Sequence, residues 1–413
     1  MELTKTNKIF EKCLASGQPT TKILNFGMHS YADTFINTNQ LELTEPIIPL
    51  ECHLNETFGT IQLGYITNDY DRYSLYSYSY TSSNSEFSKN HWNNYYQEIQ
   101  KSFNVVGKTV VEIGSNDGYL AKQFLKNKNI VIGVDASKEM CDIAKKEGII
   151  TVNRLFNIDT AEEIKNSFSA VDLIIANNVF NHSNDPLNFA QAVYNLLTEN
   201  GLFIFELPYW KSTVESNRFD QIYHEHITYF TLKYAFNLLN LVGFNIFDYK
   251  IVDYHGGSLR VYATKSNKNT KVNLKVQAGI ELENKMGLFN AETYYKWQKT
   301  LTEKRNVFLS NFYSLRLNNP DTPIVGIGAA AKANTFLTYY NLNNTVIDYI
   351  TDSSEYKQGK YTPLTRIPIV SDEIFKNYKK VYGLILSWNI SDKLKEVLLK
   401  INPNIEFIKN ESL

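Results

Sequence analysis

Two imidazoles and a carboxylate stand side by side in the segment Tyr223-His224-Glu225-His226. An imidazole titrates near neutral pH and a neighbouring carboxylate raises its basicity, so this combination is typical of a general base. We expect Glu225 to pair with either His224 or His226 in an active site. Two other interpretations stay open. One histidine caps the helix that follows while Glu225 is solvated, or the His-x-His pair binds a metal with Glu225, although no further ligand stands at a recognisable spacing.

A glycine-containing turn lies within Val110–Leu120, directly after an apolar run. Gly114 and Gly118 allow a ligand to approach the backbone, and Asp117 can cap the helix that begins there. Asp135 ends the next apolar run, where its carboxylate can accept both hydroxyls of a ribose. Because the turn departs from the dinucleotide form G-x-G-x-x-G, it indicates a different nucleotide-like cofactor. The expected cofactor-binding residues here are Glu112, Gly114, Ser115, Asn116, Asp117, Gly118 and Asp135.

Further polar side chains follow another apolar run, at the same expected sheet edge. Asn177 and Asn178 can hold the cofactor or a substrate hydroxyl, and we add them to the cofactor-binding set. His182 either donates to a substrate oxygen or is an ordinary loop histidine. Tyr78 and Tyr80, in a stretch rich in tyrosine and serine, either supply phenolic donors or pack on one face of a strand.

A second glycine turn, Gly326-x-Gly328-x-x-Ala331, is followed by Lys332 and later by Asp352. On its own the pattern is a weak signal for a dinucleotide site. Lys332 makes it more informative, because a cation beside the N-terminal amides of a helix suits a diphosphate.

The elements that position these residues are predicted by the alternation of apolar runs and helical patterns. Between residues 83 and 265 this alternation predicts an α/β domain with a parallel sheet. Its last two strands, 245–253 and 258–264, should form an antiparallel pair around the turn His255-Gly256-Gly257. Residues 1–82 form a small N-terminal module, and residues 266–413 form a helical connector and a second, Rossmann-like α/β domain.

Composition excludes several classes of function. The 413 residues carry 42 Lys+Arg against 43 Asp+Glu, a net charge of −1, so no global field attracts nucleic acid or an anionic membrane. Cys13, Cys52 and Cys141 have no paired spacing, which indicates a reducing compartment. There is no long apolar run and no signal-peptide pattern. We expect a soluble cytoplasmic protein, a monomer or homodimer, that binds neither nucleic acid nor membrane.

The run Glu112-x-Gly114-x-x-x-Gly118 resembles the first motif of the S-adenosylmethionine (SAM) methyltransferases. Several motifs, in order and over nearly the whole chain, resemble one family, the deoxysugar C-methyltransferases. Beside that turn, they are Tyr80-Thr81-Ser82-Ser83-x-Ser85 with His91 beyond, Tyr223-His224-Glu225-His226, His255-Gly256-Gly257-Ser258-x-Arg260, Gly328-Ala329-Ala330-Ala331-Lys332-x-Asn334, Lys357-Gln358-Gly359-Lys360-Tyr361-Thr362-Pro363 and Ser387-Trp388-Asn389.

The resemblance implies a class I, seven-stranded SAM methyltransferase domain between a zinc-binding N-terminal module and a C-terminal domain that holds the nucleotide of an NDP-4-keto-deoxysugar. The resemblance also implies two Cys-x-x-Cys pairs, which coordinate zinc in members of the family. The four positions here read Cys13, Ser16, Asn55 and Phe58, so we expect no metal. Leu364 stands where the family tends to have glycine, which could alter the nucleotide loop.

The family chemistry implies removal of a proton beside a ketone, followed by methylation of the carbon at C3. We assign the base to His226, oriented by Glu225, with Tyr223, Tyr80 and His182 as donors to the ketone oxygen. The expected substrate-binding residues are Tyr78, His224, His255, Arg260, Gly328, Ala329, Lys332, Asn334, Tyr361 and Trp388.

Three alternatives remain at this point. A sugar O- or N-methyltransferase would use the same cofactor edge. An NAD-linked sugar-nucleotide oxidoreductase could use the Gly326-x-Gly328 turn. The eroded zinc module also makes a catalytically idle sugar-nucleotide sensor conceivable, against which the intact Tyr223–His226 segment argues.

Overall fold

The computed structural model describes residues 8–69, 72, 83, 85–169, 171–265 and 273–410. A seven-stranded sheet forms its centre, in the order β12-β13-β10-β9-β6-β7-β8. Six of these strands run in the same direction, and β13 runs antiparallel to its neighbours β10 and β12. Their bounds are β6 Thr109–Ile113, β7 Ile130–Asp135, β8 Ile150–Asn153, β9 Val171–Asn177, β10 Leu197–Pro208, β12 Phe244–Val252 and β13 Ser258–Lys265. The expected terminal antiparallel pair is therefore present.

Helices cover both faces of this sheet, which explains why its strands read as nearly continuous apolar runs. Alternate residues of one strand face different cores: Val110 of β6 packs with one helical layer and Val111 with the other. The first layer consists of α2 (Glu86–Phe103), α3 (Tyr119–Leu125) and α4 (Lys138–Lys146). The second consists of α5 (Ile158–Phe168), α6 (Pro186–Leu196) and α8 (Leu232–Val242), and the short α7 (Trp210–Glu215) follows β10.

The N-terminal residues build a four-stranded antiparallel sheet in the order β11-β4-β3-β2. Three strands come from the N-terminal segment: β2 (Thr21–His29), β3 (Ile48–Asn55) and β4 (Thr60–Leu63). The fourth, β11 (Thr228–Tyr229), comes from the central part of the chain, two residues after His226. A further pair joins β1 (Lys8–Ile9) to β5 (Tyr65–Ile66). The N-terminal module is thus tied directly to the loop that carries the expected base.

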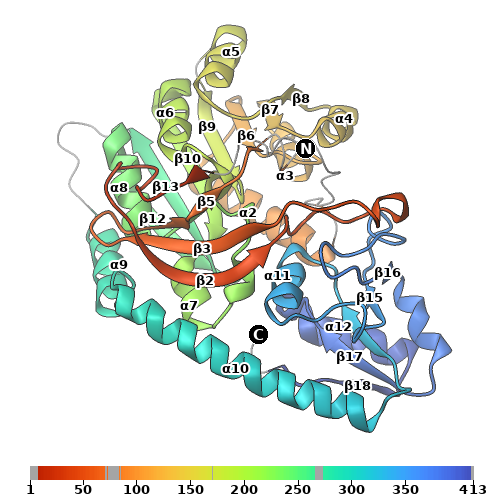
Figure 1. Cartoon of the computed structure of the whole chain (residues 1–413). Helices are drawn as coiled ribbons and strands as arrows, with labels where there is room; N and C mark the ends of the chain where they lie inside the picture. Colours follow the sequence, from red (N-terminus) through yellow and green to blue (C-terminus); the bar gives the residue numbers. More distant parts are fainter. Residues whose placement is uncertain are drawn as a thin grey trace.

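The C-terminal domain is a five-stranded parallel sheet in the order β16-β15-β14-β17-β18. Its strands are β14 (Ile324–Ile327), β15 (Tyr349–Thr351), β16 (Ile369–Val370), β17 (Val381–Ile385) and β18 (Ile405–Phe407), with helices α11 (Ala331–Tyr339) and α12 (Ser391–Ile401). It is reached through α9 (Leu274–Lys285) and the long α10 (Ala291–Asn318). Figure 1 shows α10 passing along the N-terminal sheet towards the C-terminal sheet.

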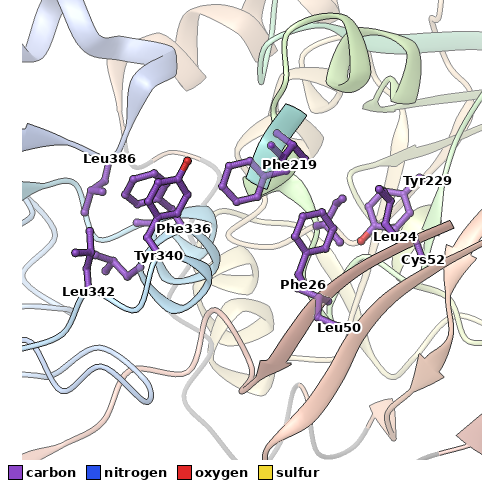
Figure 2. Close-up of a cluster of buried hydrophobic side chains, with 14 of the residues drawn as sticks. Leu24, Phe26, Leu50, Cys52, Phe219, Tyr229, Phe336, Tyr340, Leu342 and Leu386 are labelled. Atoms are coloured by element: carbon purple, nitrogen blue, oxygen red, sulfur yellow. The ribbon is translucent and has the colours of Figure 1, made fainter. Parts of the chain in front are cut away.

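One apolar cluster joins the three parts of the chain. Phe26 of β2, Phe219 of the central part and Tyr340 at the end of α11 belong to the same buried core, and Phe219 stacks on both rings. Figure 2 shows this cluster running from Cys52 and Tyr229 to Leu342 and Leu386. Because this core is continuous, the three parts hold one another in place and can share a site at their junction.

Among the described residues, no helix is long and apolar enough to span a bilayer. Within the same residues, no group of three or more His, Cys, Asp or Glu side chains is arranged to hold a metal ion. Cys13, the remaining thiol of the expected zinc set, is buried and lies 3.0 Å from the hydroxyl of Thr60. Apolar side chains of the module pack against α10.

Candidate active site

A large cavity, about 850 Å³ in volume, lies where the three parts of the chain meet. It opens beside β6, which pairs with both β7 and β9 and is therefore the point at which the strand order reverses. Ligands of open α/β sheets bind at this point, outside the carboxyl ends of the strands. Its lining also includes residues of the loop 221–226, residues 254–255, the start of α11 and the segments 352–357 and 387–390. One cavity thus brings together the expected cofactor edge, the expected base and the C-terminal turn.

The turn after β6 forms the cofactor edge of this cavity. Gly114 has a positive φ of 70°, and a Cβ there would lie 2.8 Å from Val179. Asp135 lines the cavity and accepts hydrogen bonds from the backbone N–H groups of Asn116 (2.9 Å) and Ser137 (2.8 Å). Burial raises the pKa of Asp135. Its carboxylate is held in one orientation and keeps lone pairs for a ligand donor.

Several buried polar atoms at this edge have no hydrogen-bond partner among the residues that the structure describes: Glu112 Oε2, Ser115 Oγ and Asn178 Oδ1. All three residues line the cavity. Burial, assisted by the nearby Asp117, raises the pKa of Glu112. Unpartnered buried acceptors are uncommon in proteins, so this edge fits a ligand that presents several donors, as the ribose hydroxyls and ammonium group of SAM do.

The structure separates the expected cofactor-binding residues into two groups. Glu112, Gly114, Ser115, Asn116, Asp135, Asn177 and Asn178 line the cavity. Asp117 and Gly118 do not: a Cβ on Gly118 would lie 2.5 Å from Ile149, so this glycine allows close packing inside the protein. Asp117 accepts from Tyr119 N (3.2 Å), at the start of α3, and from the hydroxyl of Ser83 (2.5 Å). These two residues shape the turn from behind.

His226 lies in the cavity wall formed by the loop 221–226, in a turn closed by a hydrogen bond from its own N–H to Tyr223 O (3.0 Å). Its Nδ1 is 2.8 Å from the backbone carbonyl of Gln221. Because a carbonyl only accepts, the proton is on Nδ1, which leaves the lone pair on Nε2. Burial lowers the pKa of His226 to about 4, so the ring is neutral at pH 7 and able to accept a proton.

The expectation that Glu225 orients His226 is wrong. Glu225 instead accepts from the backbone N–H of Asp33 at 3.1 Å, and Gln221 O orients His226. The tight turn spreads consecutive side chains in different directions, so neighbours in sequence do not pair. Glu225 still lines the cavity, its Oε2 has no partner within the described part of the chain, and burial raises its pKa to about 7.

Other rings complete this wall. The centroid of Tyr223 lies 4.0 Å from that of His226, and the centroid of His182 lies 5.2 Å from it. Burial lowers the pKa of His255 to about 3 and that of His182 well below its usual value. All of these residues line the cavity, so its lining includes three imidazoles that are neutral at pH 7. His224 does not line it, because its Nε2 faces the carbonyl of Pro49 at 3.2 Å.

The C-terminal wall carries Lys332 in the first turn of α11. Its ammonium group lies 4.2 Å from the centre of the Trp388 ring and donates to the side chain of Asn389. Burial lowers the pKa of Lys332 to about 8. Trp388 does not line the cavity, and its indole N–H donates to Asp220 at 2.6 Å. This wall can hold an anion through Lys332 and the N-terminal amides of α11.

Several expected substrate-binding residues lie elsewhere. Gly328 and Ala329 are behind the turn, where Ala329 N donates to Asp352 at 2.8 Å. Asn334 donates to Ala32 O at 2.5 Å, and the backbone of Tyr361 pairs with that of Ile36. These two contacts fasten the C-terminal domain to the N-terminal module. Tyr78 and Tyr80 lie outside the described residues.

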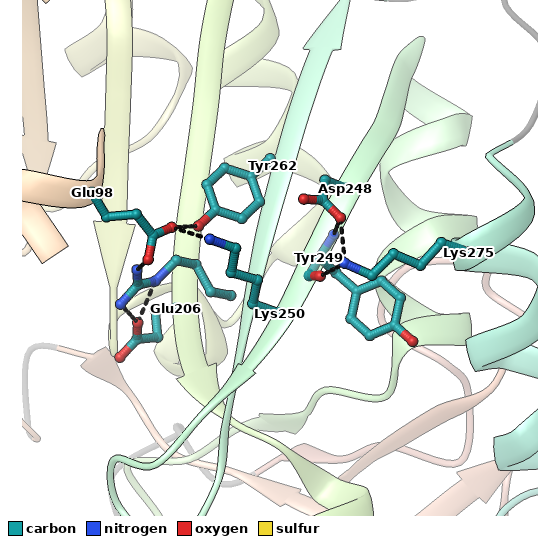
Figure 3. A network of polar contacts seen from close by, with 8 residues as sticks. Glu98, Glu206, Asp248, Tyr249, Lys250, Tyr262 and Lys275 are labelled. Atoms are coloured by element: carbon teal, nitrogen blue, oxygen red, sulfur yellow. Dashed lines mark hydrogen bonds and ion pairs between the residues drawn. The ribbon is translucent and has the colours of Figure 1, made fainter. Parts of the chain in front are cut away.

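Arg260 is a further correction, because it belongs to a buried ion network. Its guanidinium lies 2.6 Å from Glu206 and 3.1 Å from Glu98, and only 3% of its side chain is exposed. Glu98 also contacts Lys250 and the hydroxyl of Tyr262, as Figure 3 shows. With its donors occupied by carboxylates and no place in the cavity lining, Arg260 is unavailable to a diphosphate.

Gln221 and Tyr254 are among the cavity residues that the sequence-predicted set did not include. Gln221 precedes the Tyr223–His226 segment by one residue, and only its place in the same loop pointed to it. Its importance lies in backbone and side-chain hydrogen bonds that the residue type does not predict.

Two family models match the chain: a methyltransferase domain over residues 90–248 and a C-methyltransferase C-terminal domain over residues 253–406. The C-methyltransferase NovU of Streptomyces niveus is 30% identical over 304 residues, which cover 74% of this chain and 70% of that protein. The ubiquinone biosynthesis O-methyltransferase of Coxiella burnetii is 26% identical over 144 residues, covering 34% of this chain and 56% of that one. The solved structure of magnesium protoporphyrin IX methyltransferase from Synechocystis PCC 6803 is 13% identical with a TM-score of 0.34, covering 43% of this chain and 79% of that one.

The sheet order and the methyltransferase domain model define a class I methyltransferase whose cofactor is SAM. The relation to NovU and the C-terminal domain model go further. The chain belongs to the C-methyltransferase family, and it is a SAM-dependent C-methyltransferase. This assignment takes the place of the O- or N-methyltransferase and NAD-linked oxidoreductase alternatives.

Proposed function

We propose that the enzyme methylates a ring carbon, C3, of a nucleotide-linked 4-keto-deoxysugar. The observation that carries this proposal is that one cavity contains a cofactor edge, a neutral imidazole and a lysine at a helix N-terminus. The motifs that resemble the deoxysugar C-methyltransferases supply the substrate class, and the family assignment supplies the reaction type.

SAM, when bound, supplies an electrophilic methyl group. Asp135, Glu112 and the turn after β6 would hold this cofactor. The substrate must then offer a nucleophilic carbon. A ketone acidifies the adjacent C–H, and Nε2 of His226 takes this proton because Nδ1 is already protonated and bound to Gln221 O. The substrate carbon becomes an enolate carbon, which is nucleophilic.

The negative charge that develops on the ketone oxygen requires donors. Glu225, whose pKa is raised to about 7, and Tyr223 lie in the same wall as His226 and can donate to that oxygen, with His182 as a third candidate. Tyr80 stays a prediction from the sequence. Lys332 and the start of α11 are our candidates for binding the diphosphate. The ammonium group of Lys332 is buried, which favours a direct ion pair with the diphosphate.

The proposal is tested by incubating the purified enzyme with SAM and a panel of NDP-4-keto-deoxysugars that differ in nucleotide and deoxygenation pattern. We expect at least one sugar nucleotide to gain the mass of one methylene, with the new methyl group on a ring carbon by NMR. The matched variant His226→Asn should bind SAM as the parent does but lose turnover. Failure to methylate any 4-keto sugar, with full SAM binding, would refute the substrate class.

A further inference from the structure

Gln221 is a buried residue of the cavity wall that the reaction described above does not use through its side chain. It ends the short 3-10 helix Phe219–Gln221, is 6% exposed and lines the cavity. Its amide Nε2 donates to the backbone carbonyl of His255 at 2.8 Å. Its Oε1 is buried and has no hydrogen-bond partner in the described part of the chain.

The orientation of this amide is fixed by chemistry. A backbone carbonyl cannot donate a hydrogen bond, so the nitrogen of Gln221 must face His255 O, and the oxygen must face away from it. Rotating the amide would place two acceptors against each other. Gln221 Oε1 is therefore a fixed acceptor that lacks a donor, a state that proteins seldom retain without a reason.

The residue that carries this acceptor also orients the expected base. The backbone carbonyl of the same residue accepts from His226 Nδ1 at 2.8 Å, so a shift of Gln221 would also move the base. The cofactor edge is formed by different segments, the turn after β6 and the ends of β7 and β9. A molecule held against His226 is therefore the one best placed to offer Gln221 a donor.

We propose that Gln221 is a specificity-determining residue, whose Oε1 accepts a hydrogen bond from a hydroxyl or amino group on the substrate ring, on or next to the carbon that His226 deprotonates. This inference rests on the proposed function and adds to it a requirement on the substrate. A sugar that lacks this donor leaves the buried acceptor unpaired and is a poor substrate, because a site built to bind a polar group rejects the analogue without it.

The test compares a complete substrate with counterparts that lack one donor group, in the parent enzyme and in two variants. The best substrate of the panel is measured against counterparts in which one ring hydroxyl or amino group at a time is replaced by hydrogen, and kcat/KM is determined for methylation. Gln221→Met keeps the length of the side chain and removes the acceptor. Gln123→Met, the same change at a buried glutamine of α3 outside the cavity, is the matched control.

We expect the parent enzyme to prefer the complete substrate over one of the counterparts by about 10- to 100-fold, the cost of an unpaired buried acceptor. Gln221→Met should abolish this preference by slowing the complete substrate, while the control keeps it. If Gln221→Met slows both substrates equally, or if the preference persists, Gln221 has only a structural role and the proposal is wrong.

Two further results are also decisive. If Gln221→Met does not fold, judged by circular dichroism, Gln221→Asn replaces it, because shortening the side chain withdraws the acceptor and the same criterion applies. If the parent methylates no 4-keto sugar at all, the proposed function fails and the role of Gln221 falls with it. An active parent with an unchanged preference refutes the role of Gln221 alone.

Discussion

Replacing Arg260 by methionine distinguishes the ion network of the structure from the substrate-binding role that the sequence suggested. The guanidinium lies 2.6 Å from the fully buried Glu206 and 3.1 Å from Glu98. Methionine keeps much of the side-chain volume but leaves the carboxylate of Glu206 without its main counter-charge. Removing one partner of a buried pair costs about 3–5 kcal/mol. For a domain of this size we expect the melting temperature to fall by roughly 6–20 °C.

The assay is urea or thermal unfolding of the variant, together with the KM for the sugar nucleotide measured well below the melting temperature. We expect the stability to fall and KM to stay within a factor of about two. The double variant Arg260→Met/Glu206→Gln should regain part of the lost stability, because the buried negative charge leaves with the arginine. A stable Arg260→Met protein with a greatly raised KM would refute this reasoning and return Arg260 to the substrate.

Three further predictions concern single side chains. Asp135→Asn should weaken SAM binding at least about tenfold by calorimetry, since the amide offers one acceptor oxygen in place of two; unchanged affinity would remove Asp135 from the cofactor site. Burial raises the pKa of Glu283 from 4.5 to about 7, so the folded state binds a proton more tightly than the unfolded state and stability is lost as pH rises through this window; Glu283→Gln should therefore gain about 3 kcal/mol relative to the parent between pH 4.5 and 8 in urea unfolding, and an equal difference at both pH values would contradict this. Burial lowers the pKa of His224 to about 4, so its contribution to the free energy of unfolding is present above pH 6.5 and is lost as pH falls towards 4. Between pH 7 and 5 the free energy of unfolding of the parent should fall by about 2 kcal/mol more than that of His224→Asn. Equal losses in the two proteins would argue against a neutral buried ring.

Local patterns predicted much of the central domain. The apolar run of β6, the glycine turn after it and the antiparallel pair around His255-Gly256-Gly257 all appear where the sequence placed them. Such features depend on residues close together in the chain, so strand periodicity and turn residues suffice. The apposition of Asp135 and the turn after β6 followed from strand pairing alone.

Contacts between distant segments were beyond the sequence. The strand β11 pairs with β4 across more than 160 residues, and the residues Thr228-Tyr229 do not predict that pairing. Arg260 was predicted to bind the substrate because nothing in the sequence indicated that Glu98, on α2, would face this arginine. The Glu225 and His226 prediction failed for the opposite reason, since adjacency in sequence does not mean contact in a tight turn.

The fate of one hydrogen tests the central claim, that His226 removes a proton from a ring carbon beside a ketone. A 4-keto sugar nucleotide labelled with deuterium at C3 is methylated by the enzyme, and the product is examined by mass spectrometry and NMR. We predict that the product carries a new carbon-bound methyl group and no deuterium at C3. A product that is methylated and keeps its deuterium would contradict the account.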